Sequence, residues 1–239
     1  MKFAVIGSEV DSSLSPLLHS WIYGELNLDN QYGYIKLSSN SVDNIVDKIK
    51  TSNLHGANIT MPFKEKIIKY IDELDQSAIN IGSVNCILVK DGYIKGYNTD
   101  LFGFQKLIDV NRINLINKNI IILGAGGASR AIARFLNSQS FPFSIFNRSQ
   151  HNLDKMLIDL SLNNIKTLNS CDENINMDID IVINCLPISI DYSTILKKLF
   201  PLINRYDTII DINYMPIKNN LRSDLFVDGM DMFIFQAIK

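Results

Sequence analysis

Ile120-Ile-Ile-Leu-Gly124-Ala-Gly126-Gly127-Ala-Ser129 is the stretch of the chain on which the fold prediction depends. Its apolar run has the length of a buried strand, and the segment that follows has apolar residues at helical spacing. Gly124 permits the tight turn that must connect the two. A strand, a glycine turn and a helix start, in this order, indicate one unit of a doubly wound α/β domain.

The same turn predicts a phosphate site. Gly126 lets the backbone come close to a ligand, and the N–H groups and dipole at a helix start favour a pyrophosphate. Ser129 replaces the third glycine of the usual spacing, so a tight turn without a ligand is the alternative. The candidate cofactor contacts at this turn are Gly124, Gly126, Gly127 and Ala128.

The next apolar strand, residues 143–146, indicates which cofactor to expect. About twenty residues after the glycine turn, an NAD-binding unit places an acid that bonds the ribose 2′-hydroxyl. This chain has Asn147-Arg148-Ser149 there instead. An acid would repel a 2′-phosphate, whereas Arg148 offers a planar fork of donors that matches one. The sequence therefore predicts NADP, with a solvated loop cation as the alternative reading of Arg148.

Composition limits the classes of partner. The 239 residues are 46% hydrophobic, which supports a full core, and carry 23 basic and 25 acidic residues. A net charge of −2 gives no field that would attract nucleic acid or a membrane, so we expect a small-molecule substrate and a monomer or homodimer. Three widely spaced cysteines predict neither a disulfide framework nor a metal site. With no apolar run of membrane-spanning length, these features predict a cytoplasmic protein.

Alternating strand and helix patterns predict two doubly wound α/β halves. Residues 1–110 are expected to form a substrate-binding domain, completed by residues 228–239, and residues 111–227 a Rossmann-type NADP-binding domain. Expected strands lie at residues 3–6, 32–37, 57–60, 143–146, 179–185 and 208–212, with a hairpin of residues 84–90 and 93–97 around Asp91-Gly92. Expected helices lie at residues 16–26, 42–49, 101–110, 128–136, 153–160, 195–199 and 233–239, the second capped near Asn40 or Ser41.

Four polar residues stand where helices are expected to begin. Ser13 and Ser15 precede a helix opened by Pro16, so they either cap it, with Ser15 as the N-cap, or bind a substrate carboxylate. Lys64 is expected in the first turn of a helix opened by Pro62, where the dipole disfavours a cation, which invites a functional reading. A surface lysine is the alternative. Asp100 can be an N-cap, a catalytic group or both.

Short polar motifs occur along nearly the whole chain. They are Ser13-Leu-Ser15-Pro16 with His19, Asn58-Ile-Thr60-Met-Pro62-Phe-Lys64, Val84-Asn85, Asn98-Thr99-Asp100, Gly124-Ala-Gly-Gly-Ala128, Asn147-Arg148-Ser149, Asp211-Ile-Asn-Tyr214-Met-Pro216 and Gln236-Ala237. Together and in this order they resemble the shikimate dehydrogenase family. The resemblance implies NADP-linked interconversion of 3-dehydroshikimate and shikimate in aromatic amino-acid (chorismate) biosynthesis.

The resemblance also implies a role for each matching residue. Lys64 and Asp100 are implied at the reacting carbon. Around the substrate carboxylate it implies Ser13, Ser15 and Tyr214, and on the ring substituents Asn58, Thr60, Asn85 and Gln236. The family's cofactor contacts fall on the glycine turn and on Asn147, Arg148 and Ser149.

The chain departs from the family pattern at several positions. Near the predicted cofactor site, Asn152 stands where the family frequently has a second basic residue, and Asn184-Cys-Leu-Pro187 is an unusual form of a loop on the cofactor side. Leu101 and Asp231 each replace a glycine of the family. The chain ends three residues after Gln236. Two other functions therefore stay open at this stage. One is a quinate/shikimate dehydrogenase that uses NAD, and the other is a nucleotide-sensing relative without turnover.

Overall fold

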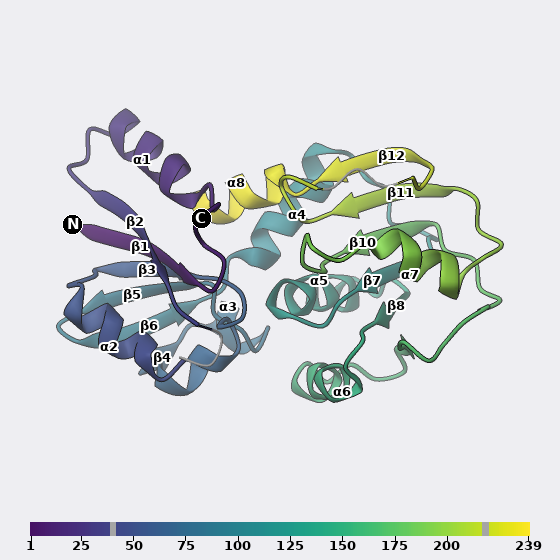
Figure 1. The fold of residues 1–239 in the computed structure, drawn as a ribbon, viewed down its shortest axis with the longest axis horizontal. Helices are drawn as coiled ribbons and strands as arrows, with labels where there is room; N and C mark the ends of the chain where they lie inside the picture. Colours follow the sequence, from purple (N-terminus) through teal and green to yellow (C-terminus); the bar gives the residue numbers. More distant parts are fainter. Residues whose placement is uncertain (39–41, 217–219) are drawn as a thin grey trace. The chain divides into compact units, whose positions relative to one another are not determined.

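The computed structural model describes residues 1–38, 42–216 and 220–239, and its chain divides after Thr99 into two units (Figure 1). The first unit is Met1–Thr99 and the second is Asp100–Lys239. The cap expected at Asn40 or Ser41 lies outside the described residues.

The described part of the first unit contains a mixed sheet of six strands in the order β2-β1-β3-β5-β6-β4. The strands are β1 (Lys2–Gly7), β2 (Gln31–Lys36), β3 (Gly56–Ile59), β4 (Glu73–Leu74), β5 (Cys86–Lys90) and β6 (Tyr93–Tyr97). β1 runs parallel to β2 and β3, whereas β5 is antiparallel to both β3 and β6. The α/β class expected for this half is confirmed, with one difference: β5 runs antiparallel to its neighbours, so the sheet is mixed and not fully parallel.

The hairpin itself is confirmed. Asp91 has φ 51° and Gly92 has φ 82°. A type I′ turn needs positive φ at both central residues, and Asp-Gly supplies them with little strain. The turn chemistry thus fixes the register of β5 on β6, and this register places Asn85 directly before β5.

The helices of the first unit are α1 (Ser15–Glu25), α2 (Asn44–Thr51), the 3₁₀ helix η1 (Lys66–Tyr70) and α3 (Gln76–Ile79). The expectation of Ser15 as an N-cap is wrong, since Ser15 is the first residue of α1 and Leu14 occupies the cap position without a side-chain bond. Ser13 supplies the local bond instead, its Oγ accepting from the Ser15 N–H at 3.2 Å. The Ser13 side chain therefore stabilises the turn that leads into α1.

The second unit has a fully parallel sheet, whose described strands are ordered β12-β11-β10-β7-β8-β9. They are β7 (Ile120–Leu123), β8 (Phe143–Phe146), β9 (Lys166–Leu168), β10 (Ile181–Asn184), β11 (Tyr206–Asp211) and β12 (Ser223–Asp228). Every residue of β7, β8 and β10 is buried, as in a sheet covered on both faces. This strand order is that of the Rossmann fold, and the order reverses between β7 and β10.

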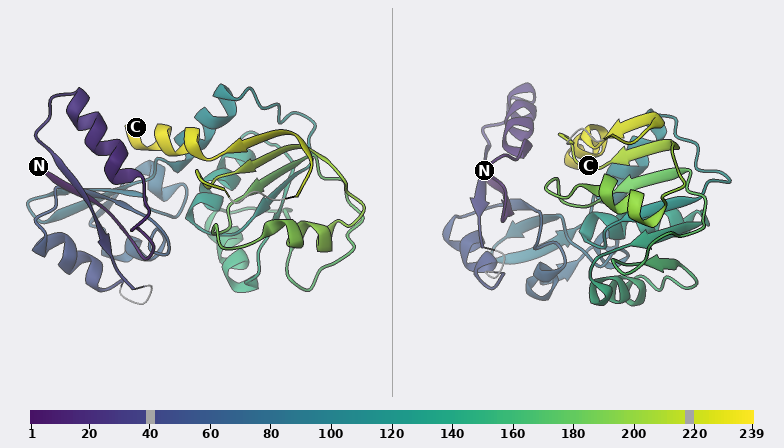
Figure 2. Two further views of the ribbon diagram at one scale, coloured as in Figure 1. Left: turned by 45° about the horizontal axis from the view of Figure 1, so that its top comes forward. Right: turned by 45° about the vertical axis from the view of Figure 1, so that its right-hand side comes forward.

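Five helices of the second unit lie within the described residues: α4 (Asp100–Val110), α5 (Gly127–Ser138), α6 (Gln150–Asp159), α7 (Tyr192–Leu199) and α8 (Met230–Ile238). α8 runs alongside α4 (Figures 1 and 2). The approach requires Gly103, because a Cβ there would lie 2.6 Å from the Met232 carbonyl oxygen. Asp231, where the family has glycine, accepts a bond from Asn111 Nδ2 at 2.7 Å.

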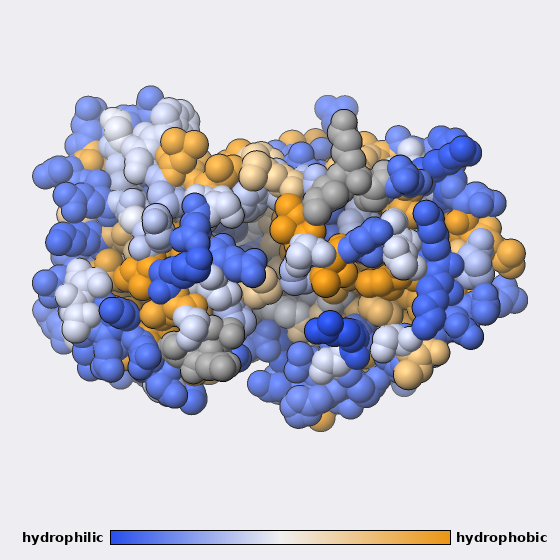
Figure 3. All heavy atoms as spheres, in the orientation of Figure 1, coloured by the Kyte–Doolittle hydropathy of each residue, from blue (hydrophilic) through white to orange (hydrophobic). Residues whose placement is uncertain are grey.

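The division after Thr99 counts α4 and α8 with the second unit, whereas the sequence assigned residues 101–110 and 228–239 to the substrate domain. Which unit binds which ligand stays a prediction at this point. No described helix is long and apolar enough to cross a bilayer. On the face drawn in Figure 3, hydrophilic residues cover most of the periphery and hydrophobic residues form separate patches.

Candidate functional site

The glycine turn of the second unit has open space in front of it. Gly124 adopts φ +110°, which disfavours any other residue, and its N–H donates to the Phe146 carbonyl at 2.7 Å. Apart from its chain neighbours, a Cβ on Gly126 would meet no atom within 4 Å, so the space beside this residue, directly before α5, is open. This turn lies where the strand order reverses, and its shape fits a pyrophosphate at a helix start.

The loop after β8 carries the residues predicted to recognise the 2′-phosphate. Asn147 Nδ2 donates to the Ser149 carbonyl at 2.8 Å, and Ser149 caps α6 by accepting from the Asn152 N–H at 3.3 Å. Arg148 between them is exposed. Because β8 is the neighbour of β7, the structure brings this loop to the same sheet edge as the glycine turn. Arg148 is thus available to a phosphate, and these residues fit NADP.

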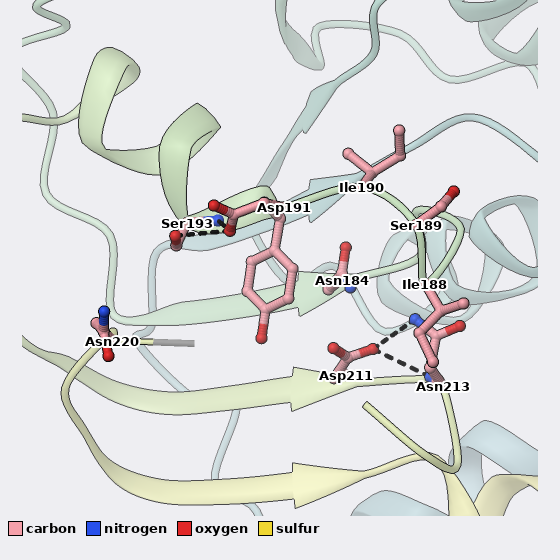
Figure 4. A pocket seen from close by; sticks show the side chains of 10 residues that line it. Asn184, Ile188, Ser189, Ile190, Asp191, Ser193, Asp211, Asn213 and Asn220 are labelled. Carbon is pink, nitrogen blue, oxygen red and sulfur yellow. Dashed lines mark hydrogen bonds between the residues drawn. The ribbon is translucent and has the colours of Figure 1, made fainter. Parts of the chain in front are cut away.

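A cavity of about 280 Å³ lies at the carboxyl ends of β10 and β11 (Figure 4). Its lining residues are Asn184, Asn213, Asn220, Asp211, Tyr192, Ser193 and 188–191. Asp211 accepts from the backbone N–H and Nδ2 of Asn213, and burial raises the pKa of its carboxyl. The strand order reverses between β7 and β10, and the cavity lies next to this point, between the ends of β10 and β11. The Asn184-Cys-Leu-Pro187 loop, predicted on the cofactor side, starts at its edge and is shaped by a bond from the Leu186 N–H to Asn184 Oδ1.

In the first unit, the structure brings three of the predicted ring-binding residues together. Asn58 lies on β3, Thr60 follows this strand, and Asn85 precedes the neighbouring strand β5. Thr99 holds both ends of the Asn85 side chain. Asn85 Nδ2 donates to Thr99 Oγ1, and Asn85 Oδ1 accepts from the Thr99 backbone N–H, each at 2.9 Å. Asn58 Nδ2 contacts the Asn85 carbonyl oxygen at 3.5 Å. The result is a fixed cluster of amide groups.

Lys64 lies in a turn and not in a helix. The peptide bond before Pro62 is cis, and η1 begins only at Lys66. The predicted placement of Lys64 in a first helical turn is therefore wrong, and the dipole argument does not apply to it. Its position is fixed by neighbours instead: the Phe63 side chain is fully buried, and the Val84 N–H donates to the Lys64 carbonyl at 2.7 Å.

Tyr32 is a residue of this cluster that the sequence did not single out. Its hydroxyl donates to Asn58 Oδ1 at 2.5 Å, and its ring stacks on that of His19 with centroids 4.2 Å apart. Burial raises the pKa of Tyr32, so the hydroxyl keeps its proton, and burial also lowers the pKa of His19, which favours the neutral imidazole. In the sequence Tyr32 was one residue of an expected strand, and no local signal marked it.

The second unit carries three of the predicted site residues, Asp100, Tyr214 and Gln236, whereas Ser13 and Ser15 lie at the start of α1 in the first unit. Asp100 is the first residue of α4 and is buried. Tyr214 follows β11, and its ring centroid lies 4.7 Å from that of Phe233 on α8. Gln236, one turn further along α8, donates from Nε2 to the Phe233 carbonyl at 2.9 Å. The structure thus brings Tyr214 and Gln236 to the same residue, Phe233, the first through its ring and the second through its backbone carbonyl.

The three thiols differ in environment, and this gives a first testable prediction. Burial raises the pKa of Cys86 to about 11 and that of Cys185 to about 12, whereas Cys171 is exposed. Since the thiolate is the reactive form, iodoacetamide at pH 7.5 should modify one thiol per folded chain and all three after unfolding. Peptide mass mapping should identify Cys171. Fast modification of Cys185 in the folded protein would contradict the buried position of that thiol beside the glycine turn.

Comparison with known proteins agrees with this arrangement. The model of the shikimate dehydrogenase substrate-binding domain matches residues 5–87. The chain is 37% identical to the NADP(+) shikimate dehydrogenase of Staphylococcus aureus and 33% identical to that of Nitrosopumilus maritimus; each match covers 99% of this chain and 90% of the relative. The crystal structure of the Aquifex aeolicus shikimate dehydrogenase matches with a TM-score of 0.81 at 28% identity, over 100% of this chain and 90% of that one.

The Aquifex aeolicus structure shares the two-domain fold described above. The substrate-binding family model falls entirely within the first unit, which carries the amide cluster and Lys64. The Rossmann sheet and the glycine turn lie in the second unit. Identity above one third over almost the entire length of both chains establishes that this chain belongs to the shikimate dehydrogenase family.

Proposed function

We propose that the chain catalyses the reversible NADPH-dependent reduction of 3-dehydroshikimate to shikimate in the cytoplasm. The observation that carries the proposal is the glycine turn with open space before α5, next to a loop that presents Arg148. This pair fits a nucleotide with a 2′-phosphate, and the curated relatives are named for NADP and shikimate. The reaction class is therefore oxidoreduction of a small molecule.

Ser13 and Ser15, together with Tyr214, are proposed to bind the substrate carboxylate. The ring substituents would meet Asn58, Thr60, Asn85 and Gln236. These side chains are amides and hydroxyls, which can donate to or accept from the hydroxyl groups of a polyol ring. The rigidity of Asn85, whose amide Thr99 holds at both ends, suits recognition of a fixed arrangement of hydroxyls.

Lys64 and Asp100 are proposed as the catalytic residues. NADPH, when bound, supplies the hydride to the ketone carbon. Negative charge then grows on the carbonyl oxygen, and the Lys64 ammonium stabilises this charge and can deliver the proton. Asp100 would accept a bond from a substrate hydroxyl and keep the ammonium charged.

The direct test is the absorbance of NADPH formed when the protein is mixed with shikimate and NADP. Quinate and NAD serve as alternative substrate and cofactor in parallel assays. Turnover with shikimate and NADP, exceeding that of the other three combinations, supports the proposal. Equal or higher activity with NAD or quinate would favour a broader dehydrogenase, and tight nucleotide binding without turnover would favour a sensing protein.

Arg148→Ala should raise KM for NADP by about ten- to a hundredfold, because a hydrogen bond to a charged group contributes about 1.5–3 kcal/mol. Any NAD reaction should change little, since only the 2′-phosphate distinguishes the two cofactors. Steady-state kinetics with each cofactor measures both effects.

Arg205→Ala is the matched control for this variant. Arg205 is an exposed arginine of the same unit whose guanidinium is paired with Asp224, outside the predicted cofactor residues. Its loss should leave both KM values unchanged. Equal weakening of NADP and NAD in Arg148→Ala would show that Arg148 supports the loop and does not recognise the phosphate.

A further inference from the structure

The Asn58 side chain is oriented by contacts at both ends of its amide. Its Oδ1 accepts the Tyr32 hydroxyl from β2 at 2.5 Å. The nitrogen end, Nδ2, points the other way, toward the Asn85 carbonyl at 3.5 Å.

Tyr32 itself is held in place. Its ring stacks on the His19 ring with an interplanar angle of 10°. Tyr32 therefore joins His19 of α1, through this stacking, with Asn58, predicted at a ring substituent. Its hydroxyl stays protonated at neutral pH because burial raises its pKa.

We propose that Tyr32, supported by His19, is a positioning residue that holds the Asn58 amide with its N–H groups directed at a substrate hydroxyl oxygen. The inference rests on the proposed dehydrogenase function. An asparagine amide is nearly symmetric in shape, so nothing in its size decides which end faces the ligand. The Asn85 carbonyl oxygen makes this decision, because it can only accept: turning the amide would place Oδ1 against it and would also end the bond from the Tyr32 hydroxyl to Oδ1.

We expect the orientation of the Asn58 amide to increase the affinity for the substrate and not the rate of the chemical step. A correctly oriented amide binds substrate and transition state alike, which affects KM more than kcat. Tyr32→Phe keeps the stacked ring and removes only the hydroxyl. We expect KM for shikimate to rise about three- to tenfold, with kcat within about twofold and KM for NADP unchanged.

Two further variants separate positioning from general structural support. In an Asn58→Ala background, Tyr32→Phe should change KM by less than about twofold, because the amide that it positions is gone. His19→Ala, which removes the ring stacked on Tyr32, should raise KM in the same direction. Tyr34→Phe is the matched control, being the same change at an exposed tyrosine of the same strand, and should leave KM unchanged.

A measurement without turnover completes the test. The side-chain amide resonance of Asn58, identified by its loss in Asn58→Ala, should shift in Tyr32→Phe and stay in place in Tyr34→Phe. The role of Tyr32 is overturned if Tyr32→Phe leaves KM for shikimate unchanged. It is also overturned if the effects of Tyr32→Phe and Asn58→Ala on KM are fully additive. Absence of shikimate turnover by the native protein would instead overturn the proposed function, while the amide resonance would still show whether Tyr32 orients Asn58.

Discussion

Lys64→Ala is expected to lower kcat by on the order of 10²–10⁴-fold, the usual loss when a general acid is removed, with only a modest change in KM for shikimate. The ammonium is needed most when negative charge develops on the substrate oxygen, so its loss affects the transition state more than the bound ground state. The Lys64 backbone is held by its neighbours Phe63 and Val84, so the fold should tolerate the change. Stopped-flow or steady-state assays with saturating NADP measure the effect.

The control is Lys69→Ala. Lys69 lies on η1, a few residues from Lys64, is exposed and pairs with Asp43 at 3.5 Å. An exposed ion pair contributes little, so activity and stability should stay near native values. An unchanged kcat in Lys64→Ala would exclude Lys64 from the chemistry and leave it a surface lysine.

Asp100→Asn is expected to reduce kcat/KM by about a hundredfold, because a hydrogen bond to a charged group is worth about 1.5–3 kcal/mol and the asparagine keeps the shape but not the charge. Both kcat and KM should worsen, since Asp100 is proposed to hold the substrate as well as the lysine. Melting temperature and kinetics should be measured on the same preparation.

Asp109→Asn provides the comparison on the same helix. Asp109 lies near the end of α4, is exposed and pairs with Lys106 at 3.7 Å. Native kinetics in Asp109→Asn together with a loss in Asp100→Asn would support the catalytic role. A lowered melting temperature with normal kinetics in Asp100→Asn would identify Asp100 as a helix-terminal residue only.

The sequence predicted the strands that form apolar runs and missed those that do not, for a physical reason. Parallel strands buried on both faces are continuous apolar runs, such as residues 120–123 and 143–146, and these are easily recognised. The short strands β4 and β9 and the edge strand β12 lack such runs. β12, Ser223–Asp228, has most of its residues exposed, so neither apolar length nor alternation marks it.

The roles of the predicted site residues stay predictions, whereas their places in the fold can be compared with the sequence. The family resemblance implies Asn58, Thr60 and Asn85 around one ring, and the pairing of β3 with β5 brings Asn58 and Asn85 together. The turn at Lys64 was missed, since a proline at position 62 is compatible with either a helix start or a turn. Tyr32 was missed because its function depends on a partner, Asn58, 26 residues away, which no local pattern can reveal.

The contact between α4 and α8 has a consequence for synthesis on the ribosome. These are the first and last helices of the second unit, and Gly103 makes their close packing possible. Met232 of α8 belongs to the same hydrophobic core as Phe104 and Leu107 of α4. Until α8 has left the exit tunnel, this apolar face of α4 lacks its cover, so we expect the second unit to complete its folding only after α8 has emerged.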